Sequence, residues 1–147
     1  MYDILSVSVN PALEKFNQVE AALKNLLESI PELEGRVDIG IYSPRSQYPR
    51  AIIRAERLEM DEINLSGGVL EHNWHFIIVI EHVAGAADEG YAKMKKLIWD
   101  VYNAIMRNRT LGVGVHATPV EALLEHRSEE KKFMFSWTFE LVVTVYI

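Results

Sequence analysis

The chain has 147 residues, no cysteine and a formal net charge of −6 at pH 7. This length fits one domain whose core can form without covalent cross-links. The lack of cysteine excludes disulfides, thiolate metal sites and a cysteine nucleophile. The acidic balance argues against a general nucleic-acid binder, which needs a basic face.

No apolar run approaches the roughly 20 residues of a membrane-spanning helix. The first residues, Met1–Ile4, lack the basic region of a secretion signal. We therefore expect a soluble cytosolic protein without a membrane partner, which stays inside the cell or leaves it only as part of an assembly.

The N-terminal part of the chain predicts an amphipathic helix. Residues 1–9 alternate weakly in hydropathy, which fits a short strand or an arm. Asn10 is a suitable helix cap, Pro11 suits the first helical position, and Pro31 ends the helix. Apolar residues recur between them at steps of three and four, namely Leu13, Phe16, Val19, Leu23, Leu26, Leu27 and Ile30.

Two strands and two loops are predicted next. Residues 36–42 alternate between apolar and polar side chains, which is typical of a half-buried strand. The two prolines of residues 43–49 predict a stiff loop. Residues 50–60 read as a second strand with a charged outer end, as at a sheet edge or in a protruding hairpin. Residues 61–73, which contain Ser66-Gly67-Gly68, are expected to form an irregular loop.

The middle of the chain predicts a central strand followed by a helix. Residues 74–83 carry apolar side chains on both faces, which predicts a strand covered on both sides. Asp88 is expected to cap the following helix. Gly112 and Gly114, beyond that helix, are interpreted as a bulge, a point of close backbone packing or, because they follow a helix, an exit turn into the sheet. The apolar stripe of the helix comprises Tyr91, Met94, Leu97, Ile98, Val101, Tyr102 and Ile105.

The C-terminal part predicts two more strands. Residues 115–125 form a strand interrupted at Pro119, residues 128–132 a solvated turn, and residues 133–147 a long strand with one apolar face, over which we expect the helix pair. The order is therefore α-β-β-β-α-β-β. It predicts a single α+β domain over residues 1–147, with two helices packed on one mostly antiparallel sheet.

Three histidines raise the question of a metal site. His72, His75 and His82 lie around the central strand, near Glu71 and Glu81. His75 and His82 are separated by an odd number of residues, so a strand places them on opposite faces. We interpret all three as surface or half-buried imidazoles, and expect no metal.

Acid–base catalysis has equally weak support. Four carboxylates follow the second strand, and closely held carboxylates can differ in pKa, but this group reads as a solvated edge whose repulsion neighbouring arginines relieve. The carboxylates are Glu56, Glu59, Asp61 and Glu62, and the arginines are Arg54 and Arg57.

A phosphate-binding loop and a nucleophile are also not indicated. Gly112 and Gly114 follow a helix, whereas a phosphate-cradling loop precedes one. No serine stands in a nucleophile-elbow pattern. We therefore expect no enzyme, no catalytic residue and no cofactor.

Trp99 is the aromatic residue that core packing explains least. It lies with Lys95 and Lys96 near the less apolar side of its helix. Exposed tryptophans are enriched in protein interfaces. Trp99 is therefore interpreted as a rim residue or as a contact for a partner.

The order of elements and several local sequences resemble the tail-terminator (tail completion) proteins of long-tailed bacteriophages. The resemblance covers most of the chain. It rests on the first helix ending near Ile30-Pro31, the strand pair around Pro44 and Pro49, and the strand of residues 74–83. It also rests on the helix exit at residues 108–115 and the closing Val143-Thr144-Val145-Tyr146.

The resemblance implies a structural role. Such proteins form a ring of six subunits that caps the tail tube, ends tail polymerisation and provides the surface for head joining. The implied partners are further copies of the chain, the tail tube protein and the head-side connector protein, while DNA passes through without specific binding. The implied location is the head-proximal end of the virion tail, and the host cytoplasm during assembly.

Ring formation needs heterologous contacts, in which one patch meets a different patch on the neighbour. Protruding loops, the charged end of the second strand and Trp99 supply the candidate subunit or tube contacts: Arg45, Tyr48, Arg50, Arg54, Arg57, Trp99 and Lys131. Other readings remain open. One is another neck or tail-tube component of the same fold, and another is a small ligand-binding regulatory domain with a pocket between helices and sheet. A hydrolase ranks last.

Overall fold

A computed structural model of the chain describes residues 10–65 and 69–147, without the side chains of residues 61–65. The predicted strand or arm in residues 1–9 lies outside the described residues. In the described part, two helices pack on a five-stranded sheet, which confirms the predicted α+β class. The elements are α2 (Pro11–Glu28), η1 (Pro31–Leu33), β1 (Val37–Ile39), β2 (Arg50–Leu65), β3 (Val69–Ala84), α3 (Ala87–Arg107), β4 (His116–Glu129) and β5 (Lys132–Tyr146).

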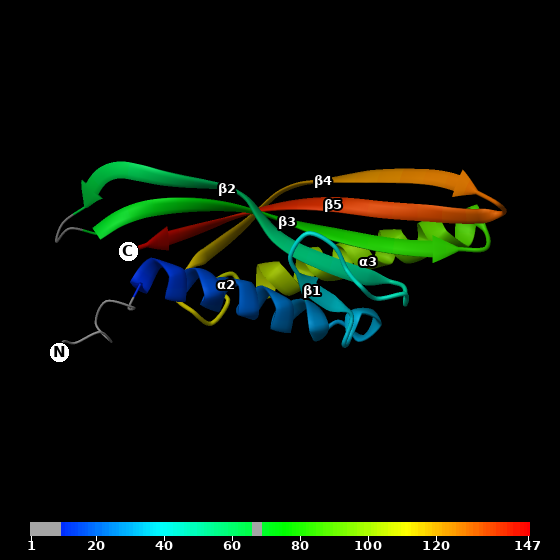
Figure 1. Ribbon diagram of the computed structural model, residues 1–147, viewed down its shortest axis with the longest axis horizontal. Helices are drawn as coiled ribbons and strands as arrows, with labels where there is room; N and C mark the ends of the chain where they lie inside the picture. Colours follow the sequence, from blue (N-terminus) through cyan, green and yellow to red (C-terminus); the bar gives the residue numbers. More distant parts are fainter. Residues whose placement is uncertain (1–9, 66–68) are drawn as a thin grey trace.

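The strands lie in the order β1-β2-β3-β5-β4, and all neighbours are antiparallel except β1 and β2. Two long hairpins, β2–β3 and β4–β5, therefore meet along β3 and β5 at the centre of the sheet (Figure 1). At this centre Ile78 is paired with Ile53 on one side and Phe139 on the other.

Both helices cover the same face of the sheet. Phe16 of α2 packs with its ring centroid 5.3 Å from Trp74 and 5.5 Å from Phe76. The indole of Trp137, which projects from β5 to the same side, bonds to the backbone of α3 at Met94. These helices and the strand residues beneath them share one hydrophobic core.

The prediction that β3 is covered on both sides is therefore wrong. The side opposite the helices, here called the open face, has no helix over it in the described part of the chain (Figure 1). Ile77 is nevertheless buried there. Its cross-strand neighbours Arg54 and Glu140 explain this, because the aliphatic stems of long charged side chains cover apolar surface.

The two helices begin differently. The Leu13 N–H donates to Asn10 Oδ1 at 3.1 Å, and Pro11 occupies the first turn, as the sequence predicts. Asp88, by contrast, is not the cap of α3: the helix begins at Ala87 behind Ala86, which makes no side-chain cap bond. Asp88 lies in the first turn instead, where a negative charge favours the helix through its dipole.

The irregular loop predicted over residues 61–73 is largely strand. Leu70 is paired with Asn64 of β2, and residues 71–73 are paired with Thr144–Tyr146 of β5. Pairing on both sides satisfies the backbone of this segment and overrides its polar composition. The Ser66-Gly67-Gly68 sequence lies outside the described residues.

Two strands also differ from expectation. β1 ends at Ile39, because Gly40 takes a φ of 139°, and Ile41 and Tyr42 are exposed. β4 continues through Pro119 with a register shift before Glu121. A proline is tolerated here because β4 is an edge strand, where one row of N–H groups has no strand to bond.

Two turns of the chain also bear on the predictions. The predicted turn of residues 128–132 narrows to Glu130 and Lys131, with φ values of 47° and 67°. Gly112 and Gly114 form the predicted exit turn and not a point of close packing, since a Cβ at either position would meet nothing within 4 Å. Their φ values of 70° and 74° show that they are needed for the turn itself.

Gly90 gives a direct test of the packing of α3 on the sheet. A Cβ at this position would collide with the Phe135 ring and lie 2.9 Å from the Cβ of Ala84. We expect Gly90→Ala to lower the free energy of unfolding by about 1–3 kcal/mol, measured by urea denaturation, because the helix must move off β5. Gly85→Ala is the matched control, with no atom within 4 Å of its Cβ. Equal stability of the two variants would contradict this packing.

Candidate interaction surface

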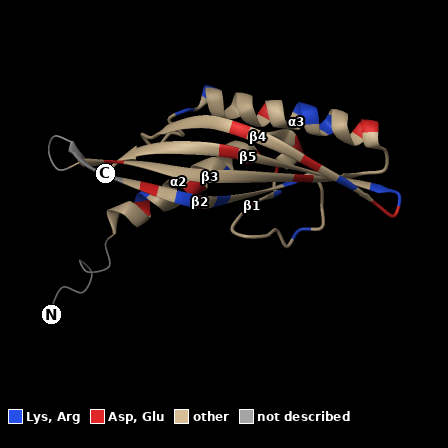
Figure 2. Cartoon of the chain, turned by 90° about the horizontal axis from the view of Figure 1, so that it is seen from above, with Lys and Arg blue, Asp and Glu red and all other residues tan. Residues whose placement is uncertain are grey.

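A groove of about 490 Å³ runs between α3 and the edge strand β4, with β5 as its floor. It exists because β4 is the last strand of the sheet that the described residues form, so that none of their strands fills the space beside α3 (Figure 2). The groove is lined by Tyr91, Lys95, Ile98, Trp99, Tyr102, Pro119, Val120, Glu121, Ala122, Trp137 and Phe139.

Trp99 is the most prominent aromatic side chain of the groove. It is 59% exposed, and its ring packs edge to face on Tyr102 with centroids 5.5 Å apart. Tyr91, on the same helix, is half exposed. Lys95 Nζ lies over its ring, 5.6 Å from the ring centroid. The contact with Tyr102 restricts the motion of the indole while most of its surface stays free, as in an aromatic anchor awaiting a partner.

The floor of the groove is apolar. The Trp137 indole N–H donates to the Met94 carbonyl at 3.0 Å, so its one polar atom is already bonded. Phe139 is buried beside it. A surface of this kind favours apolar side chains of a partner, because it offers few polar groups for a charged ligand.

The loop of residues 43–50 is built around an ion pair. Arg45 Nε and Nη2 lie 2.8 and 3.1 Å from the Asp38 carboxylate, and Ser43 Oγ donates to it at 2.7 Å. Burial alone raises the pKa of Asp38, but the hydrogen bonds from Arg45 and Ser43 outweigh it and hold that pKa below its ordinary value. Arg45, expected as a partner contact, is thus already engaged with Asp38 of the neighbouring strand β1.

The other charged candidates lie apart from the groove. Arg50 pairs with Glu81 at 2.8 Å and stacks over Tyr48, with its guanidinium carbon 4.6 Å from the ring centroid. Lys131 lies in the β4–β5 turn. Only Trp99 among the candidate contacts lies in the groove, and a contact role for the others stays a prediction.

Arg54 and Arg57 lie on the open face of β2. Arg54 is 3.6 Å from Glu56, and Arg57 is 3.6 Å from Glu59 and close to His75. Glu56 and Glu59, considered above for acid–base chemistry, are exposed and paired with these arginines. The side chains of Asp61 and Glu62 lie outside the described residues.

The three histidines do not converge. His75, on the open face, contacts Glu59, while His72 accepts a bond from the Trp74 indole at 3.3 Å. His82 projects to the other side with Nδ1 buried and without a bonding partner in the described structure. Burial lowers the pKa of His82, Lys93 lowers it further, and Glu89 opposes this. Among the described side chains, no three of the histidine, aspartate or glutamate residues gather to hold a metal.

Sequence reasoning missed two parts of the surface. Tyr91 fits the apolar stripe of α3 and was expected in the core, yet half of it is exposed. Val120 and Leu123 are exposed because they belong to an edge strand. A sequence signal for this surface exists, because Tyr91 and Trp99 are about two helical turns apart on one side of α3.

The Asp38 ion pair implies a specific pH dependence. A lowered folded-state pKa stabilises the protein above the ordinary value of 3.8, and this contribution is lost as pH falls through the lowered value. We expect the thermal midpoint of the wild type to fall more than that of Asp38→Asn between about pH 6 and about pH 3. The difference is measured by circular dichroism. Parallel curves for the two proteins would show that this pair does not stabilise the fold.

None of the described helices is long and apolar enough to span a membrane. No protein-family profile and no curated protein matches the sequence. Among solved structures, a chain described as "Virion of native gene transfer agent (GTA) particle" aligns over 89% of this chain and 92% of that chain. The identity is 8% and the TM-score 0.38, which assigns neither fold family nor function.

Proposed function

We propose that the chain is a structural protein of virion assembly that acts without catalysis. In this proposal it caps the tail tube as a ring, ends tail polymerisation and presents the surface to which the head-side connector binds. It works at the head-proximal end of the tail after assembly in the host cytoplasm, and DNA passes through the ring without specific binding.

The observation that carries the proposal is the exposed aromatic groove beside β4, an edge strand whose outer side has no strand partner among the described residues. Trp99, Tyr91 and Val120 expose apolar surface in one place, a feature of protein–protein contact regions. The order α-β-β-β-α-β-β, on which the tail-terminator resemblance rests, supports the same role.

The proposal is tested by imaging and by binding. Concentrated protein is examined by negative-stain electron microscopy for rings with a central opening. It is also incubated with purified tail tubes of the corresponding phage and sedimented, with an unrelated protein of similar charge as the control. Rings, and end-on binding that stops further tube growth, are expected. A protein that stays monomeric and does not sediment with tubes would refute the proposal.

A small ligand-binding domain is the second candidate, because the groove volume of about 490 Å³ lies in the range of small-molecule sites. This function predicts a rise in the thermal midpoint with an apolar ligand, by linkage between binding and folding. A screen of aromatic and aliphatic metabolites distinguishes the two functions, since the ring-forming protein is expected to show no such shift while it still assembles.

A further inference from the structure

The sheet has two free strand edges in the described part of the chain. Along β4, Arg109 bonds to Ala117 at the start of the strand, which leaves residues 119–129 without backbone partners on the outer side. Along β2, β1 is paired only with Ala51–Ile53, which leaves residues 54–60 uncovered. We call these two stretches the β4 edge and the β2 edge.

The β2 edge is apolar on the side of the helices. Leu58 lies opposite the buried Trp74, and Met60 lies opposite His72, so both project to that side. They are 41% and 63% exposed. On the open face the same stretch carries Arg54 and Arg57. The β2 edge thus presents apolar side chains on one face and, on the other, two arginines that the single subunit holds against Glu56 and Glu59.

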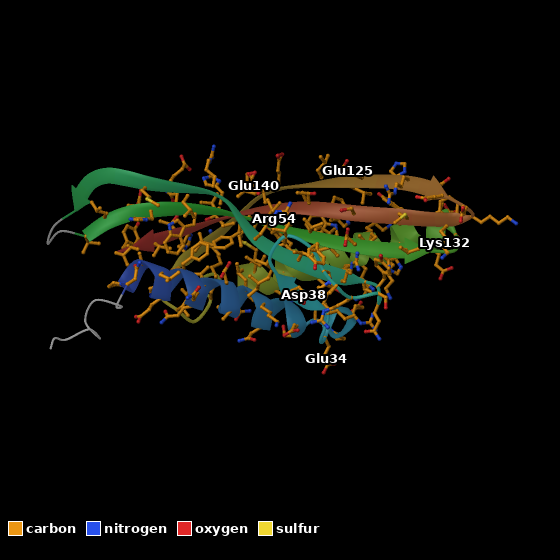
Figure 3. The ribbon with its side chains drawn as sticks, in the orientation of Figure 1. Glu34, Asp38, Arg54, Glu125, Lys132 and Glu140 are labelled. Atoms are coloured by element: carbon orange, nitrogen blue, oxygen red, sulfur yellow. The ribbon has the colours of Figure 1, made fainter. Side chains whose placement is uncertain are left out.

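The β4 edge has the complementary pattern. On the side of the helices it borders the aromatic groove, with Val120 53% exposed. On the open face it carries Glu121 and Glu125, neither of which forms an ion pair with a described residue, whereas Arg127 on the same face lies 3.9 Å from Glu129. Glu140 lies directly opposite Glu121, which adds to the negative charge. Figure 3 shows Glu125 and Glu140 on neighbouring strands, far from Glu34 near the end of α2.

We propose that the β4 edge of one copy pairs with the β2 edge of a second copy, so that the sheet continues from subunit to subunit. The inference rests on the proposed function, in which the chain forms a ring. Leu58 and Met60 then enter the groove beside Trp99, while Arg54 and Arg57 meet Glu121 and Glu125 on the open face. The partner that the groove takes is a strand of this same chain.

Strand direction is consistent with this pairing. β2, β3, β5 and β4 alternate in direction, so β2 and β4 are antiparallel to each other. A ring operation, which rotates a second copy about an axis roughly along the strands, leaves the strand directions unchanged. The β2 strand of the second copy therefore lies antiparallel to the β4 strand of the first. The two edges lie toward opposite ends of the sheet (Figure 1), so the strands are inclined to the ring axis, as in closed barrels. The contact joins two different patches, so the assembly closes into a ring only when the same contact is repeated between all neighbouring subunits.

Site-specific cross-linking through introduced cysteines tests the pairing. The chain has no cysteine of its own that would react with the cross-linker. We expect Met60→Cys and Val120→Cys proteins to give no cross-linked product alone with a short bis-maleimide, since each carries only one of the two patches. Mixed together, they give a dimer, and the double variant gives a ladder of multiples of the chain mass. Cross-linking of either single variant with itself would overturn the inference in favour of a two-fold contact.

Charge reversal provides the second arm. A β2-edge variant with Arg54→Glu and Arg57→Glu, and a β4-edge variant with Glu121→Lys and Glu125→Lys, are each expected to fold but not to form rings. Their equimolar mixture forms rings again, because alternating subunits restore opposite charges at every contact. Glu34→Lys, distant from both edges, is the control and assembles normally. Light scattering measures assembly, and thermal melting checks each fold.

The outcomes separate the inference from the proposed function. Rings of the wild-type protein together with the cross-linked ladder and rescue by mixing support both. Rings without the ladder or the rescue overturn the strand pairing and leave the ring function standing. Absence of wild-type assembly, alone and on tail tubes, overturns the proposed function and the inference with it.

Discussion

Ile78→Asp is expected to unfold the domain. Ile78 is fully buried in β3, between Ile53 and Phe139 at the centre of the sheet, in the core that both helices share. An aspartate there has no cation within reach, and ionising it without a partner is costly. We expect a loss of more than about 4 kcal/mol, comparable with the whole stability of a small domain.

The measurement is far-UV circular dichroism with urea denaturation at neutral pH. Ile78→Val, which removes one methylene group, is the matched control and is expected to lose about 0.5–1.5 kcal/mol while keeping the fold. A folded Ile78→Asp protein with near-native stability would show that the centre of the sheet is not the core described above.

Trp99→Ala is expected to abolish assembly while the subunit stays folded. The side chain is largely exposed and packs mainly on Tyr102, so its loss changes the free energy of unfolding little. As the aromatic anchor of a contact it contributes about 2 kcal/mol or more to association, which weakens each subunit contact by roughly 30-fold. Because a ring needs every contact, we expect monomers at concentrations where the wild type forms rings.

Analytical ultracentrifugation over a range of concentrations measures this effect. Leu13→Ala is the control, because Leu13 is an exposed apolar residue on α2 and does not line the groove. It is expected to assemble like the wild type. Normal rings from Trp99→Ala would exclude the groove as a subunit contact, whereas equal losses in both variants would point to general surface hydrophobicity.

The elements with strong internal patterns were predictable from the sequence. The first helix follows from its apolar period and the Asn10–Pro11 start, and β5 follows from alternation over its whole length. Segments whose structure depends on a distant partner were not. Residues 69–73 are polar and hold strand geometry only because β2 and β5 flank them.

The candidate surface was predictable only in part. Trp99 stood out because it lies off the apolar stripe of its helix, and the structure places it in the groove. Tyr91 did not stand out, since its exposure depends on where the sheet ends. Arg45 was chosen for its place in a loop with two prolines, but its pairing with Asp38 requires β1 and the loop to fold against each other. Periodicity describes single elements and does not encode which strand is outermost.

The junction of β3 and β5 has a consequence for how the chain folds. Each hairpin joins strands that are near in sequence, but Ile78 and Phe139 lie on opposite sides of α3 and β4 in the chain. Bringing Ile78 and Phe139 together closes a loop of the chain that contains α3 and β4. More conformational entropy is lost in this step than in forming either hairpin. The hairpins are therefore expected to form early and the central seam late. Until that seam closes, β3 and β5 are themselves exposed edges, which makes this step the one most open to misassociation between newly made chains.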